Sequence, residues 1–244
     1  MSTTVQNLID YAQTFTQYSP LAVGTGNQPA LGIANELQMT ITNAPFTWAW
    51  NRKEDTSVTM TAGTQDYTAL ITDFGFLERV TLTDPSDGTI YEVKDVYNNL
   101  SRGISSSNAN QRTRPNACAV QIVNYGVSVK LRFMAAPDKA YAVTVIYQKL
   151  VAPLTTLTGG GGTLIIPDQL IDVFNNLFTG EAMAVVDDAK ANLYRARGIA
   201  ALISKAEGLT EMQINAFLEQ YWMRDAQRQY NMGRTTQGVQ ASGV

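Results

Sequence analysis

The strongest constraint on the fold is the spacing of the apolar residues, which is helical at both ends of the chain and strand-like in the middle. After Pro167, apolar side chains recur every three or four residues through three segments that end near Tyr230. This spacing places them on one face of a helix. Pro167 suits a first helical position, and Gly208 suits a helix end. The C-terminal third is therefore predicted to form about three amphipathic helices in series.

Each of these predicted helices has its own apolar stripe and boundary signals. The stripes consist of Leu170, Ile171, Phe174, Leu177, Phe178, Ala182 and Val185, then of Leu193, Ala196, Ile199, Ala200 and Ile203, and last of Ile214, Phe217, Leu218, Tyr221 and Trp222. Asp187 or Asp188 can cap the second helix. The segment Thr210-Glu211-Met212-Gln213 has the pattern of a capping box for the third. Gly233 is expected to end that helix.

Two more helices are predicted at the N-terminus. The first covers residues 3–18, and the second begins at Pro29 and ends before Pro45. Their apolar positions are Val5, Leu8, Ile9, Ala12 and Phe15 in the first, and Ile33, Ala34, Leu37 and Ile41 in the second. Helices of this length have little stability alone, so they are expected to share a core with the C-terminal helices.

From Phe46 the apolar spacing changes to the alternation that is typical of strands. The runs are Ser57–Met60, Asp66–Leu70, Phe76–Leu82, Thr89–Val93, Ala117–Tyr125, Ser128–Phe133 and Tyr141–Tyr147. Short strands at this spacing favour an antiparallel sandwich or a small barrel. A polar loop, Asn98–Asn116, is predicted between two of them; it is either solvated or in contact with a subunit or a phosphate through Arg102, Arg112 and Arg114.

The order of these patterns predicts an α+β fold in which a β domain is inserted into a helical bundle. We expect N-terminal helices in residues 1–45, an antiparallel β-sandwich or barrel-like domain in 46–153, C-terminal helices in 154–230 and an extended C-terminal tail in 231–244. The two ends of the insert must then lie close together. The tail is polar and Gly-rich, and it cannot bury enough surface to fold alone.

Composition excludes several classes of chemistry. Among its 244 residues the chain has no histidine and one cysteine, Cys118. This excludes Ser–His and Cys–His nucleophile pairs, His-ligated zinc or iron sites, and an internal disulfide. General acid–base catalysis would fall to carboxylates, Lys or Tyr. We expect no enzyme activity, no catalytic residue, no cofactor and no metal. A net charge of −3 creates no overall basic field for nucleic acid. With no long apolar run and no signal-peptide pattern, the chain is expected to have no membrane partner and to be assembled in the cytoplasm.

Four short motifs that can carry chemistry are better explained as structure. Gly24-Thr25-Gly26 follows a predicted helix instead of the strand that a dinucleotide loop needs. Gly159–Gly162 lacks the Lys of a phosphate-binding loop, so it is interpreted as a linker. Asp84–Gly88 lacks the spacing of a calcium loop and is interpreted as a turn. Asp187 and Asp188 are adjacent and point in different directions on a helix, so capping explains them better than glycoside hydrolysis.

Three segments carry a resemblance to a known family. They are NAPFTWAWNR at residues 43–52, TMTAGTQDY at 59–67, and LIIPD at 164–168, which opens the C-terminal helices. Together they resemble the head-to-tail connector adaptors of tailed bacteriophages, the group that includes tail tubular protein A of short-tailed phages. The resemblance covers most of the chain in element order, but neither Asn98–Asn116 nor the C-terminal tail has a counterpart in it.

This resemblance implies a structural virion protein without catalysis. It implies a homo-oligomeric ring of about twelve copies below the portal protein, at the head–tail interface, with helices as the ring body and a β domain facing the tail or nozzle protein. Genomic DNA would pass through the ring without sequence-specific binding. The alternatives are a β carbohydrate-binding or tail-attachment module and a carboxylate glycosidase.

Partner-contacting residues are predicted in the tail, in the last helix and in the long loop. The residues expected to dock on the portal are Tyr230, Met232, Arg234, Val239 and Val244. Those expected to contact subunits or other partners are Tyr221, Trp222, Arg224, Arg228, Arg102, Arg112 and Arg114. The tail carries Arg234 and no acidic residue, which suits an acidic or carbonyl-lined groove.

Overall fold

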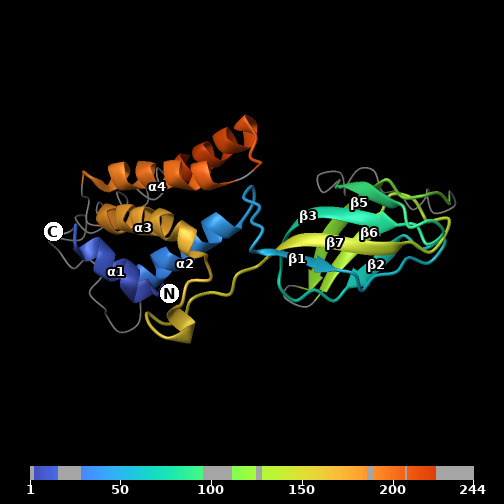
Figure 1. Ribbon diagram of the computed structural model, residues 1–244, viewed down its shortest axis with the longest axis horizontal. Helices are drawn as coiled ribbons and strands as arrows, with labels where there is room; N and C mark the ends of the chain where they lie inside the picture. Colours follow the sequence, from blue (N-terminus) through green and yellow to red (C-terminus); the bar gives the residue numbers. More distant parts are fainter. Residues whose placement is uncertain are drawn as a thin grey trace, which may run out of the picture.

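A computed structural model describes residues 3–15, 29–95, 112–124, 128–185, 189–206 and 208–223. It contains helices and one mixed seven-stranded sheet, so the protein is α+β. Figure 1 shows the helices gathered in one lobe and the strands in another, with two chain segments running between them. The predictions for residues 224–244 and for Arg102, Asp187 and Asp188 lie outside the described residues.

The helical lobe is built from both ends of the chain. Its helices are α1 (Val5–Gln13), α2 (Pro29–Thr42), α3 (Ile171–Val185), α4 (Ala191–Lys205) and a last helix at 211–223, with 3₁₀ turns η3 (Gly160–Gly162) and η4 (Asp168–Leu170) before α3. The predicted capping box is confirmed: the Thr210 N–H donates to Gln213 Oε1 at 2.9 Å, and the Gln213 N–H donates to Thr210 Oγ1 at 3.3 Å. We call the segment 211–223 the last helix below.

One apolar core joins these helices. Its buried members include Val5, Leu8, Ile9, Ala34, Leu37, Ile41, Leu170, Phe174, Leu177, Phe178, Leu202 and Phe217. α3 lies at the centre and contacts α1, α2 and α4. Phe46, Trp48 and Leu154 also belong to this core. The boundaries expected at residues 46 and 153 therefore fall at the edge of the helical core, because the aromatic residues before the first strand pack on helices.

The β lobe is a single curled sheet with the strand order β1-β7-β3-β4-β5-β6-β2. Its strands are β1 (Arg52–Asp55), β2 (Asp66–Ala69), β3 (Phe74–Thr83), β4 (Ile90–Asp95), β5 (Ala117–Asn124), β6 (Ser128–Phe133) and β7 (Ala142–Lys149). The sheet encloses a second apolar core that includes Val80, Leu82, Val120, Leu131, Phe133, Val143 and Val145.

The prediction of a purely antiparallel sheet was wrong for one pair of strands. β4 and β5 run parallel, with Lys94 opposite Ala117 and Asp95 opposite Cys118. Parallel neighbours need a connection of a dozen or more residues. Residues 96–116 provide that length, because they separate the two strands in the sequence. All other strand pairs are antiparallel.

One strand was missed, and one predicted strand was wrong. β1 was not predicted, because its sequence, RKED, has no apolar alternation. It is an edge strand paired with β7, where charged side chains can remain in water. The predicted strand Ser57–Met60 forms only an isolated bridge through Thr59, although Val58 and Met60 are buried. Its alternation reflects side-chain burial without a continuous ladder.

Candidate partner-binding surfaces

The last helix is anchored to the helical lobe by a buried polar cluster. Arg195 of α4 donates to Glu181 of α3 through Nη2 at 2.8 Å and through Nε at 3.1 Å. The Tyr221 hydroxyl of the last helix donates to Glu181 Oε1 at 2.8 Å. All three residues are buried. Such a two-pronged Arg–carboxylate pair fixes orientation, so this cluster sets how three helices meet.

Glycines on facing helices make room for this cluster. A Cβ at Gly180 would lie 2.7 Å from Arg195 Cγ, and a Cβ at Gly198 would lie 2.5 Å from Leu177 Cγ. α3 and α4 therefore approach closely, with Arg195 and Gly198 on the buried face of α4. The apolar stripe predicted for α4 was wrong in part, because Leu193, Ala196 and Ala200 are exposed.

The opposite side of the last helix faces solvent. We call this surface the outer face; it consists of Glu211, Met212, Asn215, Ala216, Glu219, Trp222 and Met223. Met212 is 79% exposed, Met223 67% and Trp222 37%. Exposed apolar side chains gathered on one helix face are a feature of interaction surfaces. The exposure of Trp222 agrees with a contact role, whereas Tyr221 points into the protein and packs on Phe217.

A groove of about 540 Å³ lies between α2 and the inner edge of the last helix. It is lined by Gly32, Asn35, Glu36, Met39, Thr40, Asn43, Ala44, Phe217, Gln220 and Tyr221. Met39 is half exposed there. The groove has no pair of catalytic carboxylates, since Glu36 is the one acidic side chain among these residues.

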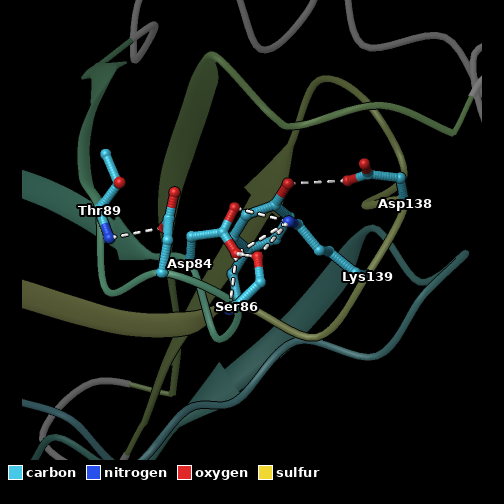
Figure 2. A network of polar contacts seen from close by, with 7 residues as sticks. Asp84, Ser86, Thr89, Asp138 and Lys139 are labelled. Carbon is cyan, nitrogen blue, oxygen red and sulfur yellow. Dashed lines mark hydrogen bonds and ion pairs between the residues drawn. The ribbon is translucent and has the colours of Figure 1, made fainter.

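A polar network ties two connections at one end of the β lobe. Lys139, between β6 and β7, donates to Asp84 Oδ1 at 2.8 Å and to Ser86 Oγ at 3.1 Å in the turn between β3 and β4. Figure 2 shows these contacts together with Asp138, which accepts from the Tyr141 hydroxyl at 2.9 Å. The turn predicted at Asp84–Gly88 is confirmed, with Gly88 at φ +74°. The network is structural, since each charge has a partner within it.

Two of the predicted loop arginines are described, and both are exposed in the β lobe. The Arg114 guanidinium lies 3.8 Å from the centre of the Tyr91 ring. Arg112 pairs through its backbone with Ala136, and its side chain runs beside Gly63. The stacked Arg114 is held in place by the cation–π contact. Neither residue touches the last helix or the outer face.

The Asp84 network predicts a pH-dependent stability. The hydrogen bonds from Lys139 and then from Ser86 lower the pKa of Asp84 from 3.8 to about 2. A carboxyl whose pKa is lower in the folded state stabilises the protein above its unfolded pKa, and this contribution is lost as the pH falls from about 4 to 2. Between about pH 4 and 2, the free energy of unfolding of Asp84→Asn should depend less on pH than that of the wild type. Lys139→Met should show a weaker pH dependence as well. Urea unfolding across that pH range measures this; two variants with the wild-type slope would contradict it.

Among the described residues, no set of three or more His, Cys, Asp or Glu side chains is arranged to hold a metal ion. In the same part of the chain, no helix combines the length and apolarity that a membrane crossing needs. Comparison of the sequence with models of protein families and with curated proteins found no match.

Three residues at the contact between α3 and α4 were not predicted from the sequence. Arg195, Glu181 and Gly198 were not proposed, because charged residues and glycines are excluded from an apolar stripe. One signal for them was present: Arg195, Gly198 and Leu202 continue the helical period from Ala191. A basic residue within such a period indicates a buried partner.

Proposed function

We propose that this protein is a head-to-tail adaptor of a tailed bacteriophage. In this role it is a structural virion protein that forms a ring of about twelve copies below the portal and continues the DNA channel toward the tail. It has no catalytic function, and DNA passes through without sequence-specific binding.

The observation that carries the proposal is the division of the chain into two lobes. Helices from both chain ends share one core, and all seven strands form the other lobe between them. This order is the one expected from the resemblance to connector adaptors. A two-lobed chain presents different surfaces to two different partners, which a connector requires.

The resemblance motif at residues 43–52 lies at the joint between the lobes. The Trp48 indole N–H donates to the Ile41 carbonyl at 2.7 Å, and the Trp48 backbone N–H donates to Gln148 Oε1 of β7 at 3.2 Å. Phe46 and Trp48 stack in the helical core. The motif thereby contacts both lobes. A joint held by contacts on both sides suits a protein that connects the head to the tail.

The finer assignments follow from this role. The helices act as a bundle that forms the ring body, and the curled sheet acts as a sandwich or barrel-like domain facing the tail protein. The C-terminal tail, with Arg234, Val239 and Val244, docks on the portal together with Tyr230 and Met232. Segments of this composition fold on binding.

Removal of residues 234–244 tests the docking role. We expect the truncated protein to keep its helical content, because the buried core of the helical lobe is already formed by described residues between Val5 and Tyr221. It should lose attachment to portal rings, as measured by co-sedimentation and negative-stain imaging. The control variant Lys94→Ala changes an exposed residue of β4 in the other lobe and should attach normally.

Two outcomes are informative. Unchanged attachment of the truncated protein would show that the helical lobe docks without the tail. A full-length protein that never binds portal rings would contradict the adaptor function itself.

A further inference from the structure

The outer face of the last helix has a regular pattern that nothing in the described chain covers. Met212, Ala216, Glu219 and Met223 follow one another at spacings of four, three and four residues, which places them in one row. All four are exposed. The helix has two acidic residues, Glu211 and Glu219, and no basic one between residues 211 and 223. The row is therefore mostly apolar, and Glu219 gives it a negative charge.

α4 carries a second exposed row with the same spacing and the opposite charge. Leu193, Arg197, Ala200 and Ser204 lie at intervals of four, three and four residues, and Ala196 lies beside them. Leu193 is 49% exposed, and the other four are exposed as well. α4 contains no acidic residue. Small side chains at Ala196 and Ala200 allow another helix to approach closely, since interaxial distances depend on the residues at the contact.

We propose that the outer face of the last helix in one copy binds the exposed row of α4 in a second copy. Met212 and Met223 would pack against Leu193 and the two alanines, and Glu219 would pair with Arg197. Methionine suits such a contact because its flexible side chain adapts to an irregular surface. The matching helical spacing and the opposite charges favour this occupant, since a second copy supplies both.

This contact joins two different patches of the same chain, so it is head-to-tail. Such contacts generate rings when the rotation between copies closes, and open filaments when it does not. The inference rests on the proposed adaptor function for the ring, and it adds the two surfaces that hold neighbouring copies together. The contact itself does not depend on a portal.

Charge-swap variants test the contact directly. The outer-face variant is Met212→Lys/Glu219→Lys, and the α4 variant is Leu193→Glu/Arg197→Glu. Because all four positions are exposed, each variant should fold as the wild type does, which circular dichroism checks. Each variant alone places like charges in the contact, and we expect self-association to weaken by about tenfold or more. Sedimentation velocity over a concentration series measures it.

Mixing the two variants distinguishes this contact from any other. The outer-face variant keeps an intact α4 row, and the α4 variant keeps an intact outer face. Their two altered surfaces pair Lys with Glu, so an equimolar mixture should assemble as the wild type does, although neither variant does so alone. A chain carrying all four substitutions pairs Lys with Glu and should assemble again. As a control, Lys94→Glu on the exposed surface of β4 should leave association unchanged.

Each contrary result has its own meaning. Variants that assemble like the wild type would overturn the inference and leave the adaptor function standing, because other surfaces would then form the ring. A wild-type chain that does not self-associate would also overturn it. A chain that self-associates through these faces without binding portal rings would support the contact and contradict the adaptor function.

Discussion

Replacing Arg195 by Met is expected to lower the free energy of unfolding by about 3–5 kcal/mol. Arg195 is 3% exposed and is held by two hydrogen bonds to Glu181. Without it, the buried Glu181 carboxylate loses the two charge-assisted hydrogen bonds from the guanidinium. Removing one partner of a buried ion pair is among the most destabilising single changes in a protein. Urea or guanidinium unfolding, followed by circular dichroism, measures the effect.

The double variant Glu181→Leu/Arg195→Met distinguishes the cost of the lone charge from the value of the pair. Because both charges are removed, we expect it to recover most of the lost stability. Lys205→Met is the matched control on the same helix: it removes an ion pair with Asp172 that is partly exposed, and it should cost less than about 1 kcal/mol. An Arg195→Met protein as stable as the control would contradict a structural role for the cluster.

Replacing Gly198 by Val is expected to destabilise the protein by about 3 kcal/mol, because the contact between α3 and α4 has no space for a side chain. A Cβ there would already lie 2.5 Å from Leu177 Cγ and 3.0 Å from the Leu177 backbone nitrogen. The backbone atom cannot move without shifting α3. The helices would separate, and the Arg195–Glu181 geometry would change with them. Thermal and chemical unfolding of the variant measure the loss.

Gly32→Val is the matched control for this substitution. Gly32 lies in α2, and a Cβ there would meet no atom within 4 Å. Since valine has a slightly better helix propensity than glycine, we expect stability within about 0.5 kcal/mol of the wild type. If both glycine variants lost similar stability, close packing would not explain the Gly198 result, because Gly32 has room for a side chain.

Local patterns in the sequence predicted most of the secondary structure. The capping box at Thr210 predicted the start of the last helix, because its hydrogen bonds involve residues only three positions apart. Pro29 begins α2 as predicted, and the alternation in Ser128–Phe133 matches β6. For the candidate surfaces, the sequence predicted a subunit or partner contact at Trp222; the side chain is exposed, and the contact itself stays a prediction. These features depend on neighbours along the chain, so they are visible without a fold.

The tertiary structure decided the features that depend on partners distant in the sequence. β1 is a strand because it pairs with the free edge of β7. The charged residues of β1 itself have no strand-like alternation. β4 and β5 are parallel neighbours, which the 21 residues between them (96–116) are long enough to allow. Arg195 is buried because it is paired with Glu181, fourteen positions earlier. Gly198 is buried because Leu177 occupies the space beside it. The sequence by itself determined where helices and strands form, and the packing of distant segments determined which faces remained for a partner.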